Sequence, residues 1–154
     1  MIGMPHLTAQ RLNHITDIII GAAIRVHRTL GPGLLESVYL ACLTFELAEE
    51  GICVETQRPI PVEYRGVRLE CGFRADLIVE GVVIVEVKSI ERLAPVHEAQ
   101  MITYLRLSEC VVGLILNFNT RVMKDGIKRM VNNFPGPPPA DADSTENGDE
   151  IRPG

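Results

Sequence analysis

Residues 74–88, RADLIVEGVVIVEVK, place three charged side chains inside two apolar runs. The runs flank Glu80-Gly81, and a glycine there supplies the backbone freedom of a tight turn, so the stretch predicts a β-hairpin. Asp76 lies in the first run, and Glu86 and Lys88 lie in the second. Burying an ionised group in an apolar layer is costly unless the group is paired or binds a metal. The hairpin therefore predicts a functional site as well as a fold.

Strand alternation groups these charges. In the second run the odd-numbered valines share one face of a strand, and Glu86 and Lys88 share the other face with Ile84. If the turn centres on Gly81, Asp76 lies across from Glu86 on that same face, with Cβ atoms about 4.5–5.5 Å apart. A register slip of one residue would move Asp76 to the opposite face.

This arrangement suits one kind of chemistry in particular. Two carboxylates at such a distance repel each other unless a cation lies between them. Mg²⁺ or Mn²⁺ fits, because a hard divalent ion takes oxygen ligands and keeps several waters. Lys88 would then position a water or stabilise negative charge on a phosphate, as in metal-assisted phosphodiester hydrolysis. The alternative at this point is a buried salt bridge between Lys88 and one of the acids.

The flanking sequence predicts the rest of an α/β domain. Apolar residues recur at helical spacing over residues 12–30, and Gly31-Pro32-Gly33 ends that helix. Pro95 suits the first turn of a later helix. The expected order is helices at 12–30 and about 34–50, extended segments at 53–57, 60–64 and 67–69, the hairpin at 73–89, a helix at about 95–108, a buried strand at 111–118, and a strand or short helix at 124–131. We expect a central mixed β-sheet flanked by helices, with the hairpin strands covered on both faces.

Composition bounds the domain organisation. We expect residues 1–10 to be a loose leader, residues 11–133 to form one domain, and residues 134–154 to be a disordered tail rich in proline and acids. The chain carries a net charge of −5, but the tail has five acids against Arg152 alone, so the remainder is close to −1. A near-neutral body does not by itself indicate nucleic-acid binding. Twelve arginines against three lysines do suit phosphate recognition.

The same features exclude some locations. No apolar run approaches the roughly 18 residues that cross a bilayer. The apolar run at residues 18–24 is not preceded by the basic residues that are typical of a signal peptide. The four cysteines form no CxxC pair. We therefore expect a cytoplasmic protein with no membrane partner.

Two spaced motifs point to a family. Asp76-x9-Glu86-x-Lys88 resembles the active site of the PD-(D/E)XK nuclease superfamily, in which an acid precedes Glu-x-Lys on adjacent strands. Gln100 and Tyr104, one helical turn apart, resemble the Gln-x3-Tyr motif of its exonuclease-like branch. The resemblance implies a restriction-endonuclease-like fold, catalytic roles for Asp76, Glu86, Lys88, Gln100 and Tyr104, and a metal held by Asp76, Glu86 and the backbone carbonyl of Val87.

A narrower resemblance covers roughly residues 10–132. Gly33-Leu34-Leu35-Glu36-Ser37-Val38-Tyr39 is similar to the signature of the GxxExxY proteins within that superfamily. The similar segments also include residues 26–28, 31–33, 72–76, 85–89, 99–100, 103–105 and 117–119. The resemblance implies that Glu36 is a further acid, binding metal directly, through water or at a second site. The alternative for Glu36 is an ordinary helix acid near a positive N-terminus.

The sequence gives fewer signals about the substrate than about the site. Arg74 precedes Asp76 by two residues, so it either contacts a phosphate or pairs with an acid; Gln100 is a second candidate for substrate binding. We expect a divalent-metal-dependent nuclease acting on DNA in preference to RNA. A domain this small has little room for its own recognition element, which favours a homodimer or a partner protein. The alternatives are a catalytically silent binding module of the same fold and an RNA-directed toxin or defence nuclease.

Overall fold

The computed structural model describes residues 6–70 and 72–136. A five-stranded sheet with strand order β1-β4-β5-β6-β7 forms the centre, and β2 and β3 form a separate two-stranded ribbon. In chain order the elements are α1 Ala9–Leu30, α2 Glu36–Glu49, β1 Val54–Pro59, β2 Val62–Tyr64, β3 Val67–Leu69, β4 Arg74–Val79, β5 Val83–Lys88, α3 Pro95–Leu107, β6 Val112–Asn117, the 3₁₀ turn η1 Met123–Gly126 and β7 Ile127–Val131. The predicted fold class, an α/β domain with a mixed sheet between helices, is confirmed.

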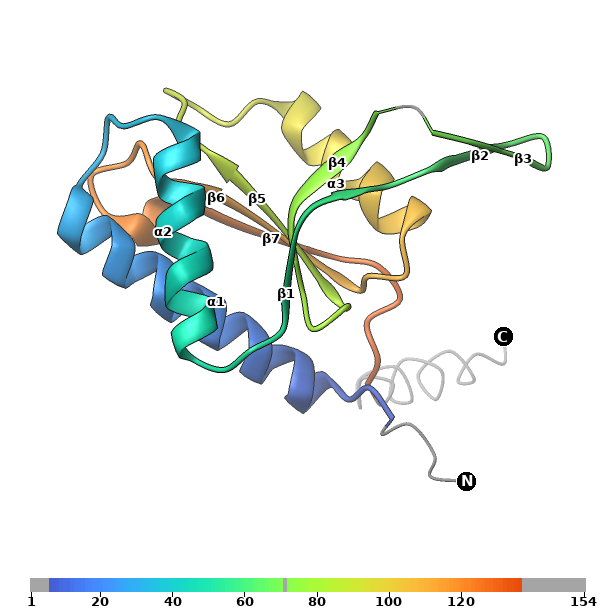
Figure 1. Cartoon of the computed structure of the whole chain (residues 1–154), viewed down its shortest axis with the longest axis horizontal. Helices are drawn as coiled ribbons and strands as arrows, with labels where there is room; N and C mark the ends of the chain where they lie inside the picture. The colour runs from blue at the N-terminus through green and yellow to red at the C-terminus, as the bar shows by residue number, and fades with distance from the viewer. Residues whose placement is uncertain (1–5, 71, 137–154) are drawn as a thin grey trace, which may run out of the picture.

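Helices cover both faces of the sheet. Helices α1 and α2 lie on one face and α3 lies on the other (Figure 1). The odd-numbered valines of β5 are buried in the core beneath α1 and α2, whereas Ile84 is buried in the core beneath α3. Each of these four side chains is at most 1% exposed. The expectation that the hairpin strands are covered on both faces is therefore correct, and the Glu86–Lys88 face of β5 points toward α3.

Only one neighbouring pair of strands in the sheet is parallel. β5 and β6 run in the same direction, with Lys88 paired to Asn117, and α3 makes the crossover between them. The other pairs are antiparallel. The β2–β3 ribbon extends away from the body beyond β1 and β4 (Figure 1). The C-terminal ends of β5 and β6 therefore meet at one edge, where loops from several parts of the chain can converge.

The hairpin register is the one that the turn sequence predicts. Val79 pairs with Val83 and Leu77 pairs with Val85, which centres the turn on Gly81. Glu80 and Gly81 both have positive φ angles, 52° and 69°. Glycine takes this conformation without the steric cost that a side chain brings. The register places position 76 across from position 86.

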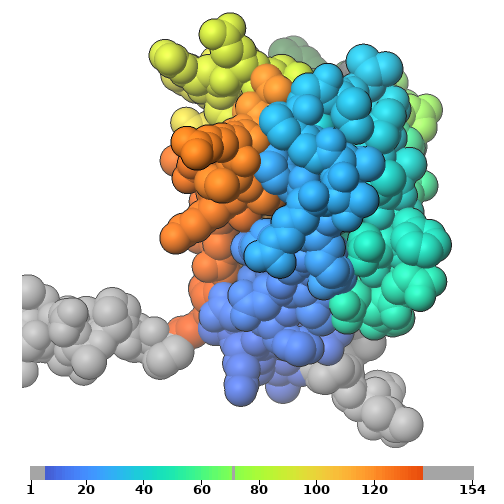
Figure 2. All heavy atoms as spheres, turned by 90° about the vertical axis from the view of Figure 1, so that its left-hand side faces the viewer, coloured from blue at the N-terminus to red at the C-terminus, as the bar shows by residue number. Residues whose placement is uncertain are grey.

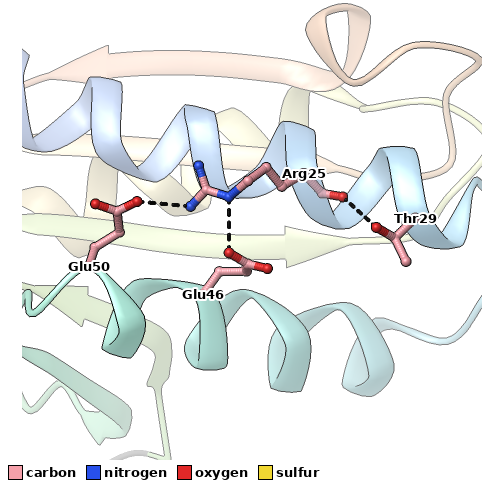
Figure 3. A network of polar contacts seen from close by, with 4 residues as sticks. All are labelled: Arg25, Thr29, Glu46 and Glu50. Carbon is pink, nitrogen blue, oxygen red and sulfur yellow. Dashed lines mark hydrogen bonds and ion pairs between the residues drawn. The ribbon is translucent and has the colours of Figure 1, made fainter.

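Local signals explain where α1 begins and ends. The Thr8 side chain accepts a hydrogen bond from the Arg11 N–H at 3.1 Å, and the Gly31 N–H donates to the His27 carbonyl at 2.8 Å. The helix begins at Ala9, so it takes up the last two residues of the expected leader. Arg25 of α1 binds Glu46 of α2 at 3.0 Å and Glu50, the residue that follows α2, at 3.1 Å, so ion pairs link the two helices at the surface (Figure 3).

The C-terminal part of the described chain combines both predicted alternatives. Residues 124–131 begin in the 3₁₀ turn η1 and continue as strand β7. Phe134 packs against the core beneath α1 and α2, and the Arg129 guanidinium lies 5.2 Å from its ring centroid. The remainder of the expected tail, residues 137–154, lies outside the described residues. Within the described part of the chain, no helix is both long and apolar enough to span a membrane.

Gly126 offers a sharp test of packing at the end of the sheet. A Cβ atom on Gly126 would lie 1.9 Å from the Asn117 carbonyl oxygen. We expect Gly126→Ala to lower the free energy of unfolding by about 3 kcal/mol, because backbone cannot move aside as a flexible side chain does. Urea unfolding measures this loss.

Gly21→Ala is the matched control for that substitution. Its new methyl group would meet only the end of the Arg25 side chain, at 3.7 Å. Alanine inside a helix should raise the free energy of unfolding by about 0.5–1 kcal/mol. Equal stabilities of the two variants would contradict the packing assigned to Gly126.

Candidate active site

Asp76 and Glu86 face each other where β4 and β5 separate. The Asp76 N–H donates to Glu86 Oε1 at 3.2 Å, and the Val87 N–H donates to Asp76 Oδ2 at 2.9 Å. The Asp76 carboxylate therefore takes the place of a β4 backbone carbonyl for the Val87 N–H, and the Glu86 carboxylate satisfies the Asp76 N–H. The direct pairing of the two strands ends at Leu77 and Val85. The acids thus occupy a gap that opens between two otherwise regular strands.

The neighbouring strand is irregular at the same level. The register of β1 with β4 brings Gln57 across from Asp76, and Gln57 has a φ angle of 52°. This conformation is uncommon for a residue with a side chain. The Arg74 guanidinium donates to the Gln57 carbonyl at 3.3 Å. Arg74 thus holds the distorted strand beside the acids, and among the described residues it forms no ion pair within 4.0 Å.

Burial and charge act strongly on Glu86. Burial raises its pKa, the negative charge of Asp76 raises it further, and the result is about 8. The hydrogen bond from the Asp76 N–H and the positive charge of Lys88 oppose the rise. The pair therefore holds a proton at neutral pH, because two adjacent carboxylates in a partly dry site cannot easily both ionise.

Lys88, Gln100 and Tyr104 meet beside Glu86. Together with His97, Met101 and Ile115 they line one small cavity of about 10 Å³ between β5 and α3. Among the described residues, Lys88 has no carboxylate within 4.0 Å, so the alternative of a buried salt bridge is not what the structure shows. Its ammonium group is therefore available to act on a ligand.

Helix α3 supplies the other side of this cavity. Burial raises the pKa of Tyr104, and the negative charges of Glu86 and Asp76 raise it further. Its ring lies edge-on to Phe73, with centroids 5.6 Å apart. His97 Nδ1 accepts a hydrogen bond from the Ala94 N–H at 2.9 Å, which caps the first turn of the helix. Gln100 is exposed and Tyr104 is half-buried, so both can reach a bound molecule.

Glu36 lies near the edge at which β5 and β6 end, at a different point from the acid pair. It is exposed in the first turn of α2, and its Oε1 accepts a hydrogen bond from the Ser89 N–H at 3.3 Å. Ser89 Oγ also donates to the Leu34 carbonyl, at 2.5 Å. The described residues contain no group of three or more acidic, histidine or cysteine side chains placed to hold one metal ion. Glu36 is thus tied to the residue after Lys88, and the structure does not bring it together with Asp76 and Glu86 as a triad.

Tyr39 explains the rest of the Gly-x-x-Glu-x-x-Tyr pattern. Its ring is fully buried and stacks on Phe118, with centroids 4.5 Å apart. Its hydroxyl donates to the Gly31 carbonyl at 2.5 Å and accepts from the Leu34 N–H at 3.0 Å. Tyr39 therefore locks the turn between α1 and α2, which sets where Glu36 begins α2.

Asn117 is a residue whose role the sequence pattern did not reveal. Asparagine at a strand end suggests a turn, but this side chain is only 3% exposed. Its Oδ1 accepts from the Ile90 N–H at 3.1 Å, and its Nδ2 donates to the Ile90 carbonyl at 3.0 Å. The amide thus pairs with the backbone two residues beyond Lys88. Asn119 Nδ2 donates to the same carbonyl at 3.3 Å.

The donor set at the site fits a hard divalent cation. Asp76 and Glu86 offer carboxylate oxygens, and each has a second oxygen outside the backbone hydrogen bonds described above. The N–H and C=O of one strand residue point the same way, so the Val87 carbonyl is directed to the Asp76 side of β5. Two carboxylates, one carbonyl and several waters form an acceptable Mg²⁺ shell. A cation would also relieve the repulsion that raises the pKa of Glu86.

These features define a class: an α/β domain with two facing acids and a lysine at the edge of a mixed sheet. A family model described as the PD-(D/E)XK nuclease superfamily matches residues 13–130. The chain belongs to this superfamily, and the predicted membership is confirmed at that level. Searches among curated proteins and among solved structures gave no match.

Proposed function

We propose that this protein is a divalent-metal-dependent nuclease of the GxxExxY branch, and that it hydrolyses phosphodiester bonds in DNA. The observation that carries the proposal is the side-by-side placement of Asp76 and Glu86, with Lys88 lining the adjoining cavity. A silent binding module would not need a proton-sharing acid pair with a nearby free lysine. Membership of the nuclease superfamily supports a nucleic-acid substrate.

Each residue has a definite part in the proposed reaction. Asp76, Glu86 and the Val87 carbonyl hold Mg²⁺ or Mn²⁺, which supplies Lewis acidity toward a phosphoryl oxygen. Lys88 orients the water whose oxygen attacks phosphorus and stabilises the charge that develops on the phosphate. The attacking water gives a proton to solvent as its oxygen bonds to phosphorus, the phosphorus–oxygen bond opposite the water breaks, and the departing oxygen takes a proton from solvent.

The remaining candidates act around this centre. Gln100 and Tyr104 support the substrate and the water from α3, in line with their place in the cavity. Arg74 contacts a neighbouring phosphate with the guanidinium nitrogens that its bond to Gln57 leaves free. Glu36 acts through water or at a second site, because it is held by the Ser89 N–H away from the acid pair. A second copy or a partner protein completes substrate recognition.

The experiment compares wild type with Lys88→Met, which removes the charge and keeps the length of the side chain. We expect wild type to bind Mn²⁺ by calorimetry and to cleave DNA. We expect Lys88→Met to bind Mn²⁺ but to cleave roughly 10²–10³-fold more slowly, because charge stabilisation at the phosphate is lost. Single- and double-stranded DNA and RNA are assayed on the same samples.

Lys128→Met is the matched control, because Lys128 is exposed on β7 and pairs with Glu98 at 2.9 Å. It should cleave at the wild-type rate. A folded wild type that neither binds metal nor cleaves would overturn the proposal and favour the silent binding module. Cleavage of RNA alone would support the RNA-directed alternative.

A further inference from the structure

A basic pocket lies apart from the acid–lysine site. It has a volume of about 450 Å³ and lies between the last turns of α1 and the segment that leads into η1. Figure 2 shows this face, with the end of α1 in blue beside residues 121–124 in orange. Arg28, Arg121 and Lys124 line the pocket, and the described residues that line it include no acid.

The three cations have no acidic partners within the described chain. Five other basic side chains among the described residues do have such partners, whereas Arg74 and Lys88 do not: Arg11, Arg25, Arg58, Arg68 and Lys128 each pair with a glutamate. Arg28, Arg121 and Lys124 are exposed, and none forms an ion pair within 4.0 Å in the described residues. On a body with a charge close to −1, this concentration of unpaired positive charge calls for an anionic ligand.

Buried contacts hold the two walls of the pocket together. His27 is 7% exposed, and its Nε2 lies 2.8 Å from the Thr120 carbonyl oxygen. The Thr120 hydroxyl donates to the Val122 carbonyl, also at 2.8 Å. The segment that carries Arg121 is therefore fixed to the end of α1, and the pocket is preformed.

Helix electrostatics explain only part of this arrangement. Cations are favoured at the C-terminus of a helix, where the unpaired carbonyls carry partial negative charge, and Arg28 lies in the last turn of α1. Arg121 lies in the loop between β6 and η1, and Lys124 lies in η1, so neither belongs to a long helix. Their convergence on the same pocket needs another reason.

The pocket and the acid–lysine site share one edge of the molecule. The Phe118 N–H donates to the Lys88 carbonyl at 2.9 Å, and Asn117 pairs with Lys88 across the two strands. Arg121 follows Asn117 by four residues. Paired strands are about 4.8 Å apart and each residue spans at most about 3.6 Å, so the Arg121 backbone lies within about 20 Å of Lys88. A nucleic-acid strand held at Lys88 can reach the pocket within a few nucleotides.

We propose that Arg28, Arg121 and Lys124 form a second phosphate-binding site, which holds the substrate backbone a few nucleotides from the bond that is cut. The inference rests on the proposed nuclease function. It specifies the path of the nucleic-acid strand beyond the acid–lysine site. Arginine forks bind phosphate oxygens bidentately and Lys124 adds a point charge. The strand therefore follows the edge at which β5 and β6 end.

The test measures binding without cleavage. Arg28→Gln, Arg121→Gln and Lys124→Gln are combined in an Asp76→Asn background, in buffer that contains a chelator. The probe is a fluorescein-labelled DNA of about 20 nucleotides, single- or double-stranded, which is long enough to span both sites. We expect affinity to fall by roughly tenfold or more, and the slope of log K against log salt to fall by about two to three.

Arg11→Gln in the same background is the control. Arg11 lies on the same helix, 17 residues before Arg28 and hence about 26 Å away along α1. Its exposed pair with Glu80, at 3.6 Å, contributes little. Affinity and salt slope should match the parent protein. A triple variant that also matches the parent overturns the inference.

Two further measurements separate this inference from the nuclease function and from a free-anion site. A wild type that binds DNA with the expected salt slope but does not cleave it overturns the nuclease function alone. A wild type that binds no nucleic acid overturns both. Inorganic phosphate is titrated by calorimetry. If phosphate binds through the three cations and does not compete with labelled DNA, the pocket is a site for a free anion. That result overturns the proposal that the pocket holds the nucleic-acid backbone.

Discussion

Replacing Asp76 with asparagine is expected to slow cleavage of every nucleic-acid substrate by on the order of 10³-fold while the protein stays folded. Asparagine keeps an oxygen that accepts the Val87 N–H, so the bond at 2.9 Å can persist. It removes the negative charge that a divalent cation needs. A loss of about 4 kcal/mol of transition-state stabilisation corresponds to a rate reduction on the order of 10³-fold. Calorimetry with Mn²⁺ should show weak or absent binding, which separates this variant from Lys88→Met.

Two other acids test how specific that effect is. Asp125→Asn changes an exposed aspartate in η1 and should leave both metal binding and cleavage unchanged. Glu36→Gln should reduce cleavage by less than Asp76→Asn, because Glu36 is bound to the Ser89 N–H and forms no triad with the acid pair. Wild-type cleavage by a folded Asp76→Asn protein would show that the acid pair is not the active site.

Replacing Glu86 with glutamine is expected to stabilise the metal-free protein above pH 8. The Glu86 pKa is about 8 in the folded protein, raised by burial and by the charge of Asp76, against an ordinary value of 4.5. Between these values the folded state binds the proton and the unfolded state does not. Stability of wild type therefore falls as pH rises through this window, by up to about 1.4 kcal/mol per pH unit from this group. Glutamine cannot ionise, so the variant loses this slope.

Urea unfolding in metal-free buffer from about pH 5 to about pH 9 gives the difference between the two proteins. Glu86→Gln should gain on wild type as pH rises and lead it by on the order of a few kcal/mol above pH 8. Glu91→Gln, at an exposed position in the loop after β5, should keep the wild-type slope. Parallel pH curves for wild type and Glu86→Gln would contradict the proton-holding pair.

Adding Mn²⁺ completes this experiment, because a ligand that binds only the folded state raises its stability by mass action. The gain for wild type should increase with pH, since metal must displace the proton that Glu86 holds. Glu86→Gln should gain much less at every pH. For the same reason, cleavage by wild type should rise with pH up to about 8, the pKa of Glu86 in the folded protein.

Much of the fold was predictable because its signals are local. Alternation along residues 83–88 predicted which side of β5 faces each core, and the glycine at position 81 predicted the register that places Asp76 across from Glu86. Helical spacing and a glycine stop predicted α1 to within a few residues. The segment at 124–131 was ambiguous because a 3₁₀ turn and a strand share it.

The candidate site was only partly predictable. The spacing of Asp76, Glu86 and Lys88 indicated the chemistry, and the superfamily membership agrees with it. The motif left open whether Glu36 binds metal directly, through water or at a second site, because its position depends on how α2 meets the loop after β5, which a short motif does not specify. The buried role of Asn117 has no local signal in the sequence, because its two bonds to Ile90 join residues that are 27 positions apart.

Local patterns were enough to predict the α/β class, the hairpin register and the nuclease superfamily, because each follows from a repeat, a turn or a short spacing. Tertiary structure alone decided the raised pKa of Glu86, since burial and the distance to Asp76 are properties of the packed sheet. It also decided the basic pocket, which joins Arg28 to Arg121 across 93 positions of chain. Contacts over such separations leave no local pattern, because only the folded core brings the two segments together.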